Sequence, residues 1–249
     1  MARFSIIIFV LVAMAYPQAQ SPDQLFVSGN QAMTNEDFRV AADYYEEVIA
    51  QGYLHKNLYY NLGNAYYRLG YNGLSIWAYE KGLQQDPQDS DLKYNLSIAN
   101  AQVRDRIQVP ETLFILEWYR WLKSSYSMNQ WMWFGIGCFL LSAFVFNLFK
   151  LVIPVGVGRS IITIFIILGI LGHGVALDQY WDITETTEAI IVDSEVFTYS
   201  APFERSDIML FKIHEGIKVE IVQAQDDWTE IILLDGKQGW IRSDTIRDL

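Results

Sequence analysis

Apolar residues are concentrated in three blocks of the 249-residue chain, near the N-terminus and at residues 131–149 and 160–177. Between the first two blocks, apolar positions recur at the three- and four-residue spacing of amphipathic helices. After residue 188 the spacing changes to two, which is typical of short strands. The pattern therefore predicts a helical domain, two long apolar helices and a C-terminal β domain, in that order.

The first apolar block has the form of a secretory signal peptide. Arg3 precedes the run Phe4–Ala15, which is too short to cross a hydrocarbon core of ~30 Å as a helix. The run ends in Ala13-Met14-Ala15, the small-x-small pattern of a cleavage site. We expect residues 1–20 to direct the rest of the chain across a membrane, either as a cleaved signal or as a retained anchor.

The polar region that follows contains a repeat of 34 residues. Short sequences recur at this spacing: Gly29-Asn30 and Gly63-Asn64, Tyr45-Glu46 and Tyr79-Glu80, Tyr60-Asn61-Leu62 and Tyr94-Asn95-Leu96. Several matches at one spacing predict a stack of helix pairs over residues 21–106, in which neighbouring pairs bury a shared apolar stripe.

Residues 56–89 resemble a tetratricopeptide repeat. The positions that carry the resemblance are Tyr59, Leu62, Gly63, Tyr66, Tyr79 and Pro87. Residues 22–55 form a weaker copy, and residues 90–106 supply a final helix that can cap the stack. The resemblance implies an all-α repeat domain that binds extended peptides along the concave face formed by the first helix of each pair.

Polar residues line that concave face in the repeat register. The candidate protein-binding residues are Asn30, Asn57, Tyr60, Asn61, Asn64, Arg68 and Asn95. An asparagine amide offers a donor and an acceptor, which suits the backbone of a bound peptide. The same side chains could instead be a solvated helix face, so the sequence leaves both roles open.

Residues 107–128 form an amphipathic segment that leads into the second apolar block. Leu113, Trp118 and Trp121 belong to an apolar series with helical spacing, and Arg120 and Lys123 lie among these residues. A helix of this composition suits the headgroup region of a membrane. It also suits packing on the repeat domain, and the sequence does not decide between the two.

The second and third apolar blocks predict a hairpin of transmembrane helices at 129–150 and 160–178. The run 160–177 contains 11 Ile, Leu, Phe or Val residues, which favour membrane insertion by roughly 3–7 kcal/mol. Lys150 precedes the link 151–159 and Arg159 is its last residue, and the positive-inside rule therefore places this link in the cytoplasm. Two crossings then put both flanking domains outside the cytoplasm.

The C-terminal segment 186–249 predicts a small all-β barrel. Strands are expected at 189–192, 209–214, 217–222 and 228–234, with a tight turn at Asp235-Gly236 and a further strand around Gly239-Trp240-Ile241. Glu215-Gly216, Trp228, this turn and the Trp240 segment resemble a bacterial SH3 domain. The resemblance implies ligand contacts at Tyr199, Phe203, Trp228 and Trp240, although both tryptophans also suit a structural role.

Charge and composition argue against several classes of function. A net charge of −11 without a basic patch argues against nucleic-acid binding. Cys138 is the only cysteine, and His55, His173 and His214 lie in three different segments. Phosphate-binding glycine loops, zinc-peptidase motifs and nucleophile elbows are missing from the sequence. We therefore expect no catalytic residue, no metal and no cofactor, and a protein that is not an enzyme.

The order of the parts resembles the BatE family of Bacteroides aerotolerance proteins over nearly the full chain. The resemblance implies a complex with sibling Bat-type membrane proteins, some with von Willebrand A-type domains, and with a MoxR-type ATPase. It also implies a role in oxidative or envelope stress tolerance.

The sequence thus predicts a multidomain protein of the cytoplasmic (inner) membrane, with an all-α repeat domain, a transmembrane hairpin and an SH3-like barrel. The expected function is an adaptor that assembles an envelope complex through the repeat domain, with both soluble domains in the periplasm. The alternative is an envelope sensor whose SH3-like domain binds cell-wall peptidoglycan.

Overall fold

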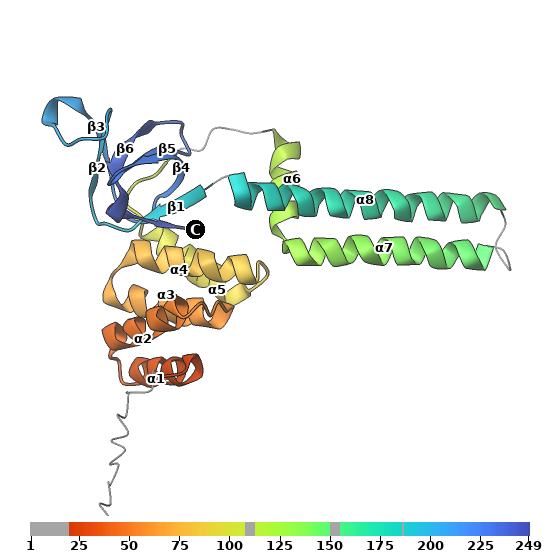
Figure 1. Cartoon of the computed structure of the whole chain (residues 1–249), viewed down its shortest axis with the longest axis horizontal. Helices are drawn as coiled ribbons and strands as arrows, with labels where there is room; N and C mark the ends of the chain where they lie inside the picture. Colours follow the sequence, from red (N-terminus) through yellow and green to blue (C-terminus); the bar gives the residue numbers. More distant parts are fainter. Residues whose placement is uncertain (1–19, 108–112, 150–154, 186) are drawn as a thin grey trace, which may run out of the picture.

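The computed structural model describes residues 20–107, 113–149, 155–185 and 187–249. Residues 1–19 of the expected signal peptide, 108–112 of the expected amphipathic segment and 151–154 of the expected link lie outside the described residues. Figure 1 shows a stack of short helices, a β domain against one end of the stack, and a long helical hairpin that projects to one side. Both soluble parts lie at the same end of the hairpin.

The repeat stack is built from paired antiparallel helices. Their bounds are α1 Pro22–Thr34, α2 Phe38–Ala50, α3 Lys56–Leu69, α4 Asn72–Gln85 and α5 Ser90–Ala101. Ser21 and Gln24 form a reciprocal capping box at the start of α1, and Asp89 caps α5. Gly70 ends α3 with a left-handed φ of 79°. The prediction of helical repeats in this part of the chain is confirmed.

The 34-residue spacing reappears as a repeated packing contact. Gly29 of α1 lies against the ring of Tyr45 in α2, and Gly63 of α3 lies against Tyr79 in α4 in the same way. A Cβ atom on either glycine would overlap the tyrosine ring. Because both tyrosines are fully buried, the ring cannot move out of the way, and the glycine is what lets the two helices of a pair approach.

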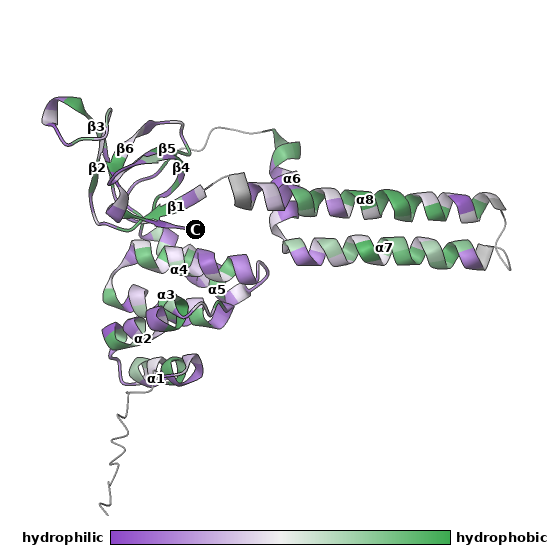
Figure 2. Ribbon diagram, in the orientation of Figure 1, coloured by the Kyte–Doolittle hydropathy of each residue, from purple (hydrophilic) through white to green (hydrophobic). Residues whose placement is uncertain are grey.

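The hairpin consists of α7 (Met128–Phe149) and α8 (Val155–Glu185). Each helix contains a window long and apolar enough to cross a membrane, Met128–Asn147 and Gly156–Asp182. Only 17% of each window is buried, and Figure 2 shows apolar residues along both helices. The hairpin therefore carries a long apolar surface that the described part of the chain leaves uncovered.

Small residues bring α7 and α8 into close contact. Gly135 lies against the imidazole of His173, and Gly169 lies against the ring of Phe139. His173 Nδ1 is 2.9 Å from the Gly169 carbonyl oxygen, and its ring is 5.5 Å from that of Phe139. Cys138 is buried as well. His173 is thus part of the packing between the two helices.

A short helix, α6 (Phe114–Ser124), runs across the hairpin near the ends that join the soluble domains (Figure 1). The Lys123 ammonium lies 2.5 Å from a carboxylate oxygen of Asp178 and 2.5 Å from one of Asp182, both in α8. The Tyr119 hydroxyl donates to Asp178 at 2.7 Å. None of the α6 residues is buried. The helix is therefore held to α8, and its apolar residues are exposed or, for Leu122, half-buried, rather than packed in a core with the repeat domain.

The β domain is an antiparallel sheet in the order β3-β2-β6-β5-β4-β1-β7. Its strands are β1 Thr187–Ile191, β2 Val196–Tyr199, β3 Met209–Ile213, β4 Lys218–Gln225, β5 Trp228–Leu233, β6 Gln238–Arg242 and β7 Ile246–Asp248. The expected turn joins β5 to β6, with Gly236 at a φ of 85°. The sequence does not predict β2 and β7, because strands of four and three residues are too short to show an alternating pattern.

The β domain packs directly on the helical repeat, a contact that the sequence does not predict. Arg247 of β7 donates to both carboxylate oxygens of Glu46 in α2, at 2.7 and 2.6 Å. The same guanidinium lies 3.5 Å from the centre of the Trp77 ring in α4. Trp77 Nε1 donates to the carbonyl oxygen of Asp248 at 2.8 Å. A bidentate ion pair and a cation–π contact on one arginine fix the last strand to the second helix of both pairs.

A further contact joins the start of α4 to the β domain. The Gly73 amide donates to the Glu215 carboxylate at 2.7 Å. Gly73 is buried, and a Cβ atom there would lie 2.5 Å from the carbonyl oxygen of Ile191 in β1. Together with the Arg247 contacts, this approach makes the repeat stack and the β domain one packed body.

Candidate functional site

Four of the five asparagines predicted to bind a partner, Asn30, Asn61, Asn64 and Asn95, are joined in pairs by hydrogen bonds between helices. Asn30 Oδ1 in α1 accepts from the Tyr45 hydroxyl in α2 at 2.8 Å. The same oxygen accepts from Asn61 Nδ2 in α3 at 2.9 Å. One asparagine oxygen therefore ties together three successive helices.

The same arrangement occurs one repeat later. Asn64 Oδ1 in α3 accepts from the Tyr79 hydroxyl in α4 at 2.8 Å and from Asn95 Nδ2 in α5 at 2.9 Å. Asn64, Tyr79 and Asn95 are each shifted by 34 positions from Asn30, Tyr45 and Asn61. We call each of these two sets of three residues a level of the stack. The sequence repeat therefore specifies a repeated polar contact as well as repeated apolar packing.

The tyrosines keep the donor role at both levels. Burial raises the pKa of Tyr45 and of Tyr79 to about 12, so each hydroxyl remains protonated at neutral pH. At each level the bonds use the oxygen of one asparagine and the nitrogen of the other. Within the described residues, one amide nitrogen and one amide oxygen per level have no protein partner, which leaves a donor and an acceptor for a ligand.

The remaining predicted residues of the face lie on α3. Asn57 and Arg68 are exposed, and Tyr60 is half-buried. The Arg68 guanidinium lies 4.3 Å from the centre of the Phe38 ring. Its charge is thus held beside the start of α2.

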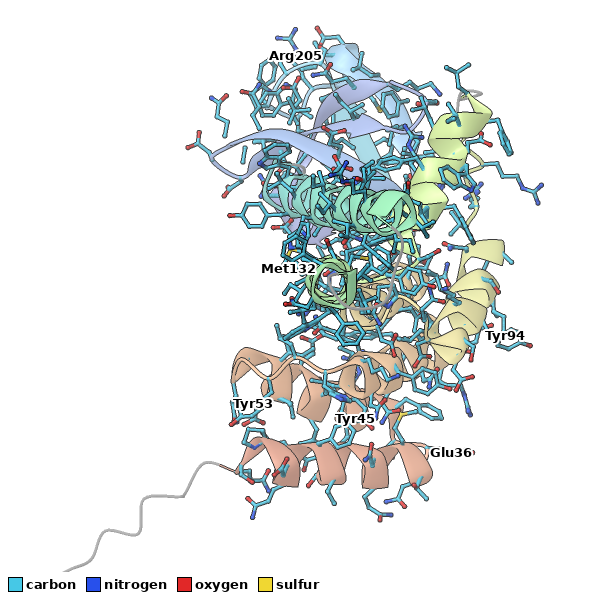
Figure 3. The ribbon with its side chains drawn as sticks, turned by 90° about the vertical axis from the view of Figure 1, so that its right-hand side faces the viewer. Glu36, Tyr45, Tyr53, Tyr94, Met132 and Arg205 are labelled. Atoms are coloured by element: carbon cyan, nitrogen blue, oxygen red, sulfur yellow. The ribbon has the colours of Figure 1, made fainter. Side chains whose placement is uncertain are left out.

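Tyr94 is an exposed aromatic residue of the same face that is not among the residues predicted from the sequence. Phe26, Tyr60 and Tyr94 follow one another at the repeat spacing, and Tyr94 is 65% exposed. Figure 3 shows its side chain pointing away from α5. The 34-residue match of Tyr60 to Tyr94 was the signal that could have identified it. We call the eight residues the asparagine face: Asn30, Asn57, Tyr60, Asn61, Asn64, Arg68, Tyr94 and Asn95.

The asparagine face and the β domain use different helices of the repeat. The face lies on the first helices α1, α3 and α5, whereas Glu46, Gly73 and Trp77 contact the β domain from the second helices α2 and α4. A partner can therefore reach the asparagine face without displacing the β domain.

Three of the four aromatic residues predicted to contact a ligand of the β domain are buried. Tyr199 and Trp228 pack edge to face at 5.6 Å between ring centres. Tyr199 pairs with Trp240 across β2 and β6, and each of the three is at most 8% exposed. Phe203 differs, because it is 47% exposed with the Arg205 guanidinium 5.8 Å from its ring centre.

Exposed apolar residues accompany Phe203 on the β2–β3 arm. Phe197, Met209 and Leu210 are each at least 40% exposed. Figure 3 places Arg205 at the end of the β domain farthest from the repeat helices. Because β3 is an edge strand of the sheet, this arm offers unpaired backbone groups beside apolar side chains. It is a second candidate surface for a ligand.

Comparison with known families gives a match for the C-terminal segment. A model described as the bacterial SH3 domain matches residues 192–248, the segment that contains β2 to β7. The C-terminal sheet is therefore similar to a bacterial SH3 domain, as its sequence predicts. A search of curated proteins finds no match to the chain.

Proposed function

We propose that the chain is a membrane-anchored scaffold of the cell envelope that binds protein partners through the asparagine face. The observation that carries the proposal is the repeated pair of asparagines, which presents an open donor and acceptor at each level, away from the β domain. The helical repeats support a stack of the tetratricopeptide type, in which such a face holds an extended peptide segment.

The hairpin supports anchoring in a membrane. The apolar windows of α7 and α8 are mostly unburied, unlike the core helix of a soluble protein. They also lie far from the N-terminus, unlike a signal sequence. Lys150 and Arg159 beside the link favour a cytoplasmic position for it. We infer a multi-pass protein of the inner membrane whose repeat and SH3-like domains lie in the periplasm.

The order of the parts suggests which partners the scaffold gathers. Its resemblance to BatE-type proteins favours membrane neighbours of the Bat type with von Willebrand A-type domains, and a MoxR-type ATPase. A complex of this kind would link the chain to oxidative or envelope stress tolerance. The proposed role is assembly rather than catalysis.

Photocrosslinking in cells tests the proposal. A benzophenone amino acid at Tyr94, on the asparagine face, is expected to capture a discrete protein partner identifiable by mass spectrometry. The same group at Glu47, an exposed position on the second helix α2, is the matched control and should not capture that partner. Equal capture at both positions, or none at Tyr94, would refute binding through this face.

The SH3-like domain supports a second candidate function, the sensing of cell-wall peptide. The match at residues 192–248 and the exposed apolar residues of the β2–β3 arm favour it. In the full chain, Phe203→Ala should lower affinity for purified peptidoglycan about tenfold, as expected for an exposed aromatic anchor. Leu234→Ala, at a similarly exposed site in the β5–β6 turn, should leave binding unchanged. If the unaltered chain does not sediment with peptidoglycan, this function is excluded.

A further inference from the structure

We propose that α6 is an in-plane membrane helix, seated in the headgroup region of the leaflet that faces the soluble domains. The inference rests on the proposed anchoring of the hairpin. Figure 1 shows α6 running across α8 rather than along it, with its last residues leading to the start of α7. Its bonds to Asp178 and Asp182 place it at the end of α8 from which the chain continues into the β domain.

The side chains of α6 fall into three arcs around the helix, at ~100° per residue. The apolar arc contains Phe114, Ile115, Trp118, Trp121 and Leu122. The arc that faces α8 contains Leu116, Tyr119 and Lys123. The polar arc contains Glu117, Arg120 and Ser124. Because one arc is already used by α8, the polar arc and the apolar arc are left to face two different surroundings.

The apolar arc is too exposed for a helix in water. Phe114 is 81% exposed, Trp121 63% and Trp118 49%. A contiguous apolar patch of this kind marks a contact with a membrane or another protein. The surrounding residues favour the membrane, since Trp133, Tyr180 and Trp181 are also large aromatic residues exposed at this end of the hairpin. Aromatic residues collect at this level of membrane-spanning helices.

Charge on α6 fits the same position. Arg120 lies on the polar arc and is exposed, where it can reach lipid phosphates. Basic residues beside Trp and Phe are typical of helices that lie ~5–10 Å deep in the interface. The partner that the structure indicates is therefore the bilayer in which the hairpin sits.

The ion pairs of Lys123 with Asp178 and Asp182 would make an in-plane α6 restrict the orientation of the whole molecule in the membrane. They fix α6 to α8, so the membrane holds the molecule along one direction through the hairpin and along another through α6. Such a two-direction anchor restricts tilting of the packed repeat and β domains. It would set the angle at which the asparagine face meets a neighbouring membrane protein.

Depth-dependent fluorescence quenching tests the inference on the full chain. Single cysteines at Trp121 or Ser124, in a Cys138→Ala background, are labelled with a nitrobenzoxadiazole dye. The protein is reconstituted in vesicles of phosphatidylcholine and phosphatidylglycerol. The label at Trp121 should be quenched by a lipid with a shallow nitroxide at least about twofold more than the label at Ser124, and iodide should give the reverse order. A third label at Leu140, in the middle of α7, reports on the hairpin through a deep nitroxide.

The three labels separate the possible failures. If Leu140 is quenched by the deep nitroxide but Trp121 behaves like Ser124, the in-plane position of α6 is wrong and the anchor stands. A label at Trp121 that neither lipid nor iodide quenches would indicate a protein contact and would also overturn the inference. If Leu140 is not quenched by lipid, the proposed anchoring fails, and the position of α6 fails with it.

Discussion

Gly73→Val should detach the β domain from the helical repeat. A valine Cβ would lie 2.5 Å from the Ile191 carbonyl oxygen and 3.0 Å from the Val192 Cα, both backbone atoms that cannot rotate away. The start of α4 would have to withdraw, and the hydrogen bond from the Gly73 amide to Glu215 would be lost with it. Overpacking and loss of a bond to a charged group together predict a cost of about 2–5 kcal/mol to docking.

Limited proteolysis and hydrogen exchange on the detergent-solubilised protein would measure the detachment. Exchange should rise in α4 and β1, and one unfolding transition should become two. Gln84→Val is the matched control, since it places the same residue at an exposed position of α4. Glu215→Gln should give a smaller effect in the same direction, because it weakens the bond without adding a clash. An unchanged single transition for Gly73→Val would show that the contact does not hold the domains together.

The detached variant also bears on function. The asparagine face lies on α1, α3 and α5, so loss of docking at α4 should leave the capture of a partner at Tyr94 intact. If capture is lost together with docking, the partner must also touch the β domain. The same variant therefore distinguishes a scaffold with one binding face from one in which both domains bind together.

Local sequence signals predicted the elements of this chain well. The spacing of 34 residues predicted the helix pairs, and the structure shows that residues matched at this spacing form equivalent contacts, as in the two Gly–Tyr pairs. The two apolar runs predicted α7 and α8. These features are visible in sequence because each is encoded by residues that are close together or periodic.

Contacts between elements that are distant in sequence have no local or periodic sequence pattern that could predict them. Glu46 and Arg247 are 201 positions apart, and each looks like an ordinary surface charge in its own segment. Gly73 looks like a weak point in a helix, although it is needed for the approach of β1. The roles of Trp228 and Trp240 stayed open, and the burial of Tyr199 was not predicted, for a related reason. In a small barrel, alternation shows that a residue faces one side of the sheet but not which aromatic side chains close over one another.

Cysteine labelling should place the repeat domain and the β domain in one compartment, with the start of α8 on the other side. In a Cys138→Ala background, single cysteines at Asp43 in α2 and Lys237 in the β5–β6 turn should react with an impermeant maleimide in spheroplasts. A cysteine at Gly156, where a side chain meets nothing within 4 Å, should react only after lysis. In intact spheroplasts, labelling should be nearly complete at Asp43 and Lys237 and nearly absent at Gly156, because Lys150 and Arg159 oppose export of the link.

The packed body makes this prediction stricter than the positive-inside rule alone. Arg247 can bond Glu46 only if both domains share a compartment, and that requires an even number of membrane crossings between them. Labelling of Asp43 and Lys237 from opposite sides would contradict the hairpin and the domain contact together. Protection of both positions in spheroplasts, with Gly156 labelled, would contradict only the orientation. In that case the asparagine face would meet cytoplasmic partners, and the proposed periplasmic scaffold would be wrong.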